Sequence, residues 1–270
     1  IDSFLQELAA LENNSMATEE DIAKLRSDLE ALEEELLRLQ ASAFEQEGNS
    51  VRQFLGDGNR QYLSGLFLGG QRILILLDSS ASMLDSTLVN IIRTRNMDDE
   101  RKREAPKWRR VVKTVDWIST QLPITSQYQI WNFNADYASV IPETKDMWLE
   151  AADRDQLNVA IENVERLVPE NGTNLTKIFR AVGNMSPPPD NIFLITDGLP
   201  TLGDRNTSNS LVTPSERLEL YEEAIEELSP GTPINVILMP LEGDPSAAAA
   251  YWQLAQYTKG SFLTPSRDWP

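Results

Sequence analysis

The chain has 270 residues, of which 41% are hydrophobic, and it carries a formal net charge of −18. So acidic a chain is repelled by nucleic acid and by anionic lipid surfaces, so we expect no nucleic acid partner and no direct membrane binding. The sequence contains no cysteine and no histidine. Disulfides, the usual zinc sites, and catalysis by Ser-His-Asp or Cys-His groups are therefore excluded.

Residues 1–47 predict a helical coiled-coil stalk. Apolar residues recur there with the alternating spacing of three and four that marks a coiled-coil seam, at Ile22, Leu25, Leu29, Leu32, Leu36 and Leu39. A seam of roughly three heptads is marginal alone and needs a partner. That partner could be a second copy of the chain, another protein, or the chain's own globular domain. Residues 48–70 are expected to form a glycine-containing connector.

From residue 71 to 270, strand and helix patterns alternate. Aliphatic runs without polar alternation, such as ILILL at 73–77, indicate strands buried on both faces. The expected strands cover 72–78, 127–134, 138–143, 191–197, 233–240 and 260–265, and the expected helices cover 105–123, 152–168, 175–185, 214–228 and 245–258. This alternation predicts an α/β fold with a doubly wound, mainly parallel central sheet and helices on both faces.

Oxygen-bearing side chains follow the central strands. Asp78, Ser80 and Ser82 share one side at every second residue after the first strand. Thr173 lies in a glycine-containing turn before a helix, and Asp197 ends another central strand. Because these segments converge at one edge of a doubly wound sheet, we expect the five residues to share a crevice. A set of oxygen ligands suits a hard cation.

This motif resembles the metal-ion-dependent adhesion site of von Willebrand factor A domains, and the resemblance covers about residues 71–265. It implies the Rossmann-like fold of that family, of bacterial type, and bound Mg²⁺, with Mn²⁺ or Ca²⁺ as alternatives. It further implies that Ser80 and Ser82 bind the metal directly and that Thr173 binds it directly or through water. Asp78 and Asp197 would act mostly through bridging waters.

The chemistry of such a site points to a protein ligand. Neutral hydroxyls leave most of the charge of the ion unquenched, and one coordination position stays open. An Asp or Glu side chain of a partner protein would fill that position through a charge-assisted bond. We therefore expect a non-enzymatic, metal-dependent protein-binding module.

Other interpretations stay open. Each of the five residues could instead cap a helix. The chain could be a Mg²⁺-dependent phosphohydrolase of doubly wound type with Asp78 as nucleophile. However, Ser80 stands where a second carboxylate is expected, and no glycine-rich phosphate loop with a following lysine is present. A third possibility is a scaffold whose stalk is the functional part and whose metal site only stabilises the fold.

An insertion at about 84–104 separates the first motif from the first long helix, where the family usually has none. It is basic in an acidic chain, through Arg93, Arg95, Arg101, Lys102 and Arg103. These side chains could pair with acidic neighbours in the insertion. Alternatively, they form a docking surface that steers an acidic partner segment toward the ion.

The cellular setting is an expectation from resemblance. No stretch approaches the roughly 18 apolar residues of a membrane span, and the chain begins with Ile1 rather than Met, so we expect a fragment. Bacterial proteins of similar appearance often carry an upstream membrane helix. We expect anchorage to the bacterial inner membrane through such a missing segment, with the chain facing the periplasm.

Overall fold

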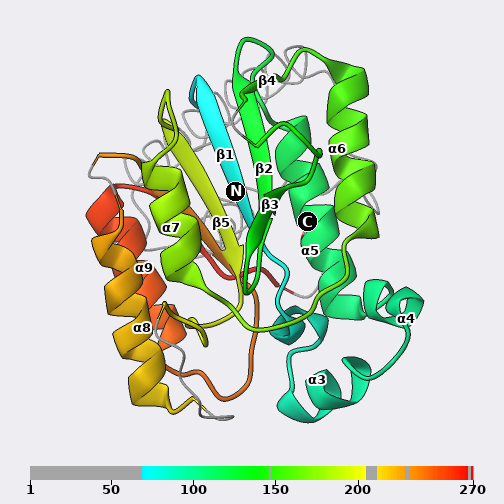
Figure 1. Ribbon diagram of the computed structural model, residues 1–270, viewed down its shortest axis with the longest axis vertical. Helices are drawn as coiled ribbons and strands as arrows, with labels where there is room; N and C mark the ends of the chain where they lie inside the picture. The colour runs from blue at the N-terminus through cyan, green and yellow to red at the C-terminus, as the bar shows by residue number, and fades with distance from the viewer. Residues whose placement is uncertain (1–68, 146, 205–211, 229–230, 267–268, 270) are drawn as a thin grey trace, which may run out of the picture. The chain divides into compact units, whose positions relative to one another are not determined.

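Within the described part of the chain, seven strands form one mixed sheet in the computed structural model (Figure 1). The structure describes residues 69–145, 147–204, 212–228, 231–266 and 269, all within the unit Ser50–Pro270. The predicted stalk at 1–47 and nearly all of the predicted connector at 48–70 lie outside the described residues.

The order of the strands in the sheet is β3-β2-β1-β5-β6-β7, and β4 pairs with β2. The strands are β1 (Arg72–Asp78), β2 (Gln127–Phe133), β3 (Tyr137–Ser139), β4 (Leu149–Glu150), β5 (Asn191–Thr196), β6 (Ile234–Leu238) and β7 (Phe262–Leu263). All pairings except those of β3 and β4 are parallel. The chain first adds β2 on one side of β1 and later adds β5 on the other. The doubly wound fold is therefore confirmed, and the strand order reverses at β1.

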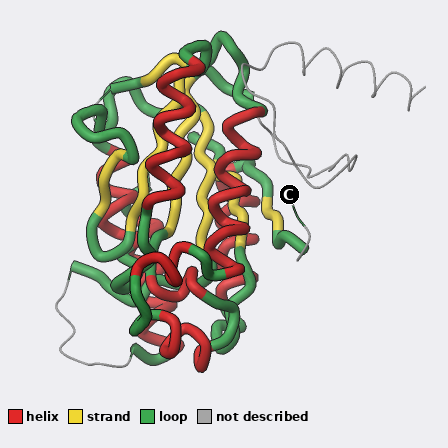
Figure 2. Tube along the Cα trace, turned by 90° about the vertical axis from the view of Figure 1, so that its right-hand side faces the viewer, coloured by secondary structure: helices red, strands yellow, loops and turns green. Residues whose placement is uncertain are grey.

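Helices cover both faces of the sheet. They are the 3-10 helix η1 (Ala81–Leu84), α3 (Leu88–Thr94), α4 (Asp99–Arg103), α5 (Pro106–Thr120), α6 (Arg154–Arg166), α7 (Leu175–Gly183), α8 (Pro214–Glu226) and α9 (Ala247–Thr258). Figure 2, seen from the side of α5 and α6, shows helices in front of the strands. No helix in the described ranges is long and apolar enough to cross a membrane.

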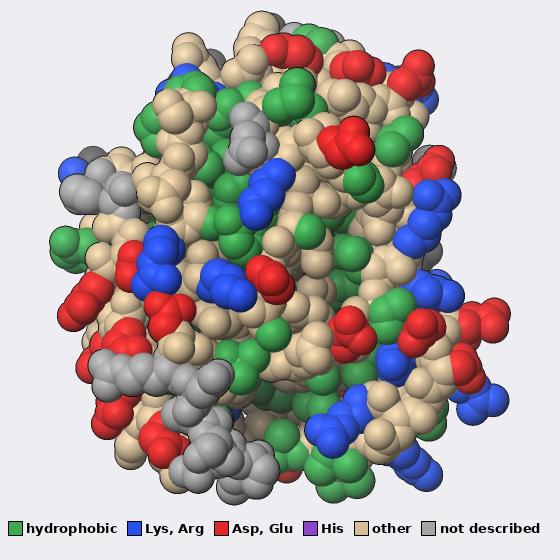
Figure 3. All heavy atoms as spheres, in the orientation of Figure 1, with side chains coloured by type: hydrophobic (Ala, Val, Ile, Leu, Met, Phe, Trp, Pro, Cys, Tyr) green, Lys and Arg blue, Asp and Glu red, His purple; other side chains and the backbone are tan. Residues whose placement is uncertain are grey.

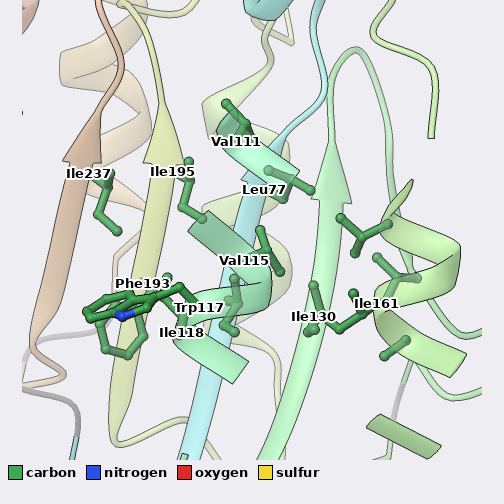
Figure 4. Close-up of a cluster of buried hydrophobic side chains, with 14 of the residues drawn as sticks. Leu77, Val111, Val115, Trp117, Ile118, Ile130, Ile161, Phe193, Ile195 and Ile237 are labelled. Atoms are coloured by element: carbon green, nitrogen blue, oxygen red, sulfur yellow. The ribbon is translucent and has the colours of Figure 1, made fainter. Parts of the chain in front are cut away.

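Strand β1 separates two hydrophobic cores because successive side chains of a strand point to opposite faces. Ile73, Ile75 and Leu77 pack into the core that contains α5 and α6. Leu74 and Leu76 pack into the core beneath α7, α8 and α9. All five are 0% exposed. Figure 4 shows the first core, in which side chains from β1, β5 and β6 lie beside α5. Two covered faces explain the unbroken aliphatic run.

The edges of the sheet differ in detail from the prediction. Strand β3 ends at Ser139, before Pro142, and β7 is only two residues long. The two residues of β4 were not predicted, because so short a strand has no periodicity to detect. The basic insertion forms α3 and α4, which lie between η1 and α5 in the chain.

Candidate metal centre

The five predicted metal-site residues lie at the edge where the central parallel strands end. Asp78 is the last residue of β1, and Asp197 directly follows the neighbouring strand β5. Ser80 directly precedes η1, Ser82 lies within η1, and Thr173 lies just before α7. This is the point where the strand order reverses, which is where open α/β sheets bind ligands. We call these five residues the candidate metal centre.

Hydrogen bonds link the five residues to one another. Ser80 Oγ lies 3.0 Å from Ser82 Oγ, and the Ser82 hydroxyl donates to Asp197 Oδ1 at 2.8 Å. The Thr173 hydroxyl donates to Asp78 Oδ2 at 3.3 Å. Asp78 Oδ1 accepts from the Ser80 backbone amide at 2.9 Å, and this bond joins the two groups of contacts. The structure thus brings all five residues together.

Backbone contacts fix the segments that carry these side chains. The Ala81 amide donates to the Asn171 carbonyl at 3.0 Å and joins the turn after β1 to the turn before α7. The Thr173 amide donates to Thr201 Oγ1, and the Thr201 amide donates back to the Thr173 carbonyl, both at 3.0 Å. A Cβ on Gly172 would lie 2.5 Å from Thr201 Oγ1, so a glycine is needed for this close approach. The convergence is therefore built into the backbone.

Helix capping does not account for the key hydroxyls. Ser80 is at the N-cap position of η1 but makes no side-chain capping bond. The cap of α7 is Asn174, whose side chain accepts from the Lys177 amide at 2.9 Å. The hydroxyl of Thr173 points instead to Asp78. Both hydroxyls therefore contribute to the centre and not to a helix end.

Asp78 is fully buried and has no ion-pair partner among the described residues. Burial, and after it the nearby charge of Asp197, raises the pKa of its carboxyl from 3.8 to about 6. Hydrogen bonds from Ser80 and Thr196 act in the opposite direction. The Thr196 hydroxyl lies 2.8 Å from Asp78 Oδ2. A buried carboxylate whose oxygens already accept several hydrogen bonds is poorly placed to act as a nucleophile, which disfavours the phosphohydrolase interpretation.

A buried lysine completes the arrangement. Lys107, in the first turn of α5, is 3% exposed. Its ammonium lies 2.6 Å from Asp197 Oδ2 and donates to the carbonyl oxygens of Ser82 and Asp85, both at 3.0 Å. The two oxygens of Asp197 thus face different partners: Oδ1 faces Ser82, and Oδ2 faces the ammonium.

The sequence prediction missed two residues of this site. Lys107 lies four residues before Val111 on the buried side of α5, in line with Val115 and Ile118. A charged residue in register with an apolar helix face is the signal that could have identified it. Thr196 closes the otherwise aliphatic run of β5, and a hydroxyl beside Asp197 at that position was a weaker signal.

The donors fit a hard divalent cation. Across the residues that the structure describes, no three His, Cys, Asp or Glu side chains form a possible metal site. The centre instead combines two carboxylates with three hydroxyls, all oxygen ligands. An octahedral shell at roughly 2.0–2.1 Å places neighbouring oxygens about 2.9 Å apart. The Ser80 and Ser82 hydroxyl oxygens, both expected to bind the metal directly, lie 3.0 Å apart, close to this spacing.

The basic insertion lies next to the centre in the chain. Its predicted docking residues are Arg93 on α3, Arg95 directly after it, and Arg101, Lys102 and Arg103 on α4. Two of them form local ion pairs, Arg101 with Asp98 at 3.8 Å and Lys102, whose side chain is 14% exposed, with Asp99 at 3.3 Å. Such pairs contribute little stability. Both predicted possibilities, local pairing and docking, are thus compatible with the geometry.

Helix α3 also exposes an apolar face. Leu88, Val89 and Ile92 are 51%, 73% and 57% exposed, whereas Ile91 is buried. Figure 3 shows hydrophobic and basic side chains side by side at the lower end of the molecule, over α3. We call these three apolar residues together with the basic residues Arg93, Arg95, Arg101, Lys102 and Arg103 the α3–α4 surface.

No family model and no curated protein matches this sequence. Solved structures do match. One is a von Willebrand factor type A protein from Catenulispora acidiphila, at 16% identity and a TM-score of 0.49. The match covers 74% of this chain and 39% of that one, so this chain spans well under two thirds of that protein.

Two further structures are from Bacteroides. The conserved hypothetical protein BatB from Bacteroides thetaiotaomicron is 18% identical, with a TM-score of 0.39, over 72% of this chain and 89% of that one. An aerotolerance-related membrane protein from Bacteroides fragilis is 15% identical, with a TM-score of 0.38, over 74% and 93%. The likeness at these identities concerns the fold alone.

Proposed function

We propose that this chain is a non-enzymatic, divalent-metal-dependent protein-binding module that captures an acidic side chain of a partner at the candidate metal centre. The observation that supports this most is the convergence of five oxygen-bearing side chains from three separated segments. The Ser80 and Ser82 hydroxyl oxygens lie 3.0 Å apart, which is close to the spacing of two neighbouring ligands in an octahedral shell.

The roles of the residues follow from their chemistry. Ser80 and Ser82 would hold the ion through their hydroxyls, and Thr173 would complete the protein side of the shell. Asp78 and Asp197 would orient these groups and balance the charge. Bound Mg²⁺ supplies a strongly electrophilic position that a carboxylate oxygen fills better than water does.

The α3–α4 surface would bind the rest of the partner segment. Its basic residues complement an acidic ligand, in contrast to the net charge of −18 of the whole chain. The exposed Leu88, Val89 and Ile92 favour a ligand that carries apolar side chains between its carboxylates. We therefore propose an acidic, amphipathic protein segment as the partner.

A synthetic peptide that alternates Glu and Leu residues tests this proposal. We expect it to bind the chain in Mg²⁺ and to lose at least tenfold in affinity in EDTA, measured by fluorescence anisotropy. The matched control is the same peptide with Gln in place of Glu, which lacks the carboxylates and should not bind. Equal binding of the Glu peptide in Mg²⁺ and in EDTA would contradict the proposal.

Two other predictions stay predictions. One is self-association through residues 1–47, which lie outside the described residues. The other is anchorage to the bacterial inner membrane, facing the periplasm, through a segment upstream of residue 1. Sedimentation of the chain with and without residues 1–47 tests the predicted self-association directly. A sedimentation coefficient that corresponds to a monomer in both cases would contradict it.

A further inference from the structure

Lys107 is the only lysine or arginine among the described residues whose side chain contacts the candidate metal centre. Its side chain and that of Asp197 are each 2% exposed. The ammonium has three acceptors, which matches its three N–H donors. All three N–H donors of the Lys107 ammonium are therefore used in hydrogen bonds within the protein.

The two carboxylates of the centre differ in how their charge is balanced. An ionised carboxylate in a protein interior is strongly unfavourable unless a cation or several hydrogen bonds compensate it. Asp197 is compensated directly by Lys107 at 2.6 Å. Asp78 accepts hydrogen bonds only, from the Ser80 amide and from the hydroxyls of Thr173 and Thr196. A divalent ion would thus meet one compensated and one uncompensated carboxylate.

We propose that Lys107 is a resident cation of the metal centre, which neutralises Asp197 before any metal binds and thereby weakens metal binding. This inference rests on the proposed function. The expected weakening follows from electrostatic repulsion. The Lys107 ammonium and a bound divalent ion would both lie near the buried Asp197 carboxylate and would repel each other.

The same charge strengthens the capture of a ligand. Two carboxylates against one ammonium and one divalent ion leave one net positive charge at the loaded centre. Without Lys107 the loaded centre would be neutral and would attract a partner carboxylate less strongly. Lys107 is also a positioning residue, since it holds Asp197 with Oδ1 toward Ser82 and fixes the carbonyl of Ser82 itself. It lowers metal affinity and raises affinity for the acidic ligand.

The test compares Lys107→Met with Lys113→Met by calorimetry with Mg²⁺. Lys113 is an exposed lysine on the same helix and serves as the matched control. We expect Lys107→Met to bind Mg²⁺ at least tenfold more tightly than the wild type and Lys113→Met to bind it equally. The Mg²⁺-loaded Lys107→Met protein should bind the Glu/Leu peptide more weakly than the loaded wild type does. An unchanged or lower Mg²⁺ affinity of Lys107→Met would overturn the inference and leave the proposed function intact.

A second measurement needs no metal and applies if Lys107→Met is too unstable for calorimetry. In EDTA, Lys107→Met leaves Asp197 buried and unpaired, and the double variant Lys107→Met/Asp197→Asn removes that charge. We expect the double variant to unfold at a higher urea concentration than Lys107→Met. If the double variant were no more stable than Lys107→Met, Lys107 would not neutralise Asp197, and the inference would be overturned. If neither the wild type nor Lys107→Met binds Mg²⁺, the metal-dependent function fails, and this urea comparison still decides whether Lys107 neutralises Asp197.

Discussion

The Thr196 hydroxyl donates a 2.8 Å hydrogen bond to Asp78 Oδ2, and both residues are 0% exposed. The two come from β5 and β1, which lie next to each other in the sheet. The contact links the last residues of these two strands at the candidate metal centre. This hydrogen bond stabilises the Asp78 carboxylate, which has no cationic partner in the described part of the chain.

Thr196→Val removes this contact and keeps the shape of the side chain. We expect a loss of about 1.5–3 kcal/mol in the free energy of unfolding at pH 7, because a buried charged group loses a hydrogen bond. Urea denaturation measures it. Thr125→Val, at an exposed threonine, is the control and should change stability by less than about 0.5 kcal/mol. Equal effects of the two substitutions would contradict the role of Thr196.

The titration of Asp78 predicts a pH dependence of stability. Burial raises the pKa of this carboxyl to about 6 in the folded protein, with a further contribution from Asp197, whereas an unfolded Asp titrates near 3.9. The folded state therefore holds the proton more tightly. This group makes the metal-free protein less stable as pH rises from about 4 to about 6, and its contribution is constant above that range.

Asp78→Asn tests this prediction, because the amide does not titrate. In EDTA, the difference in unfolding free energy between Asp78→Asn and the wild type should shift in favour of the variant between pH 4.5 and pH 7. Urea denaturation at both pH values measures the difference. A difference that stays constant would show that Asp78 titrates normally.

Gly172→Ala tests the close packing of the turn before α7. The added Cβ would lie 2.5 Å from Thr201 Oγ1 and must displace the segment that carries Thr173. We expect a stability loss of about 1–3 kcal/mol, as for other overpacked sites. Mg²⁺ binding should weaken severalfold in calorimetry while the circular dichroism spectrum stays native. If Gly172→Ala had the stability and the Mg²⁺ affinity of the wild type, this would contradict the importance of close packing at Gly172.

Charge reversal tests the α3–α4 surface. The triple variant Arg101→Glu, Lys102→Glu and Arg103→Glu should weaken binding of the Glu/Leu peptide at least tenfold at low salt. Because exposed charges are screened, the difference from wild type should shrink at higher ionic strength. Mg²⁺ affinity, measured by calorimetry, should stay the same and serves as the internal control. If the triple variant bound the peptide as tightly as the wild type does, this would contradict a docking role for these three residues.

Much of the fold was predictable because its physical signals are local. The run Ile73–Leu77 has no polar alternation since both faces of β1 are covered, and Asp78, which is also 0% exposed, marks the end of the strand. The convergence of the five site residues followed from the topology, because parallel strands end at one edge. Metal binding itself remains a prediction, which the calorimetric measurements test.

The residues that were missed depend on long-range contacts. A lysine near the start of a helix usually extends into solvent, and only the register of Lys107 with Val111 indicated otherwise. Its partner Asp197 lies 90 residues away in the chain. The exposure of Leu88, Val89 and Ile92 depends on how α3 packs on its neighbours, which periodicity over seven residues does not determine.

Calorimetry with Mg²⁺ on the wild type, Ser82→Ala and Ser215→Ala tests the central claim most directly. Ser82 contributes a hydroxyl to the centre, and Ser215 is an exposed serine at the start of α8. The wild type and Ser215→Ala should bind a single Mg²⁺ with equal affinity, and Ser82→Ala should bind at least tenfold more weakly. Absence of Mg²⁺ binding by the wild type, or equal binding by Ser82→Ala, would contradict a metal centre at this edge of the sheet.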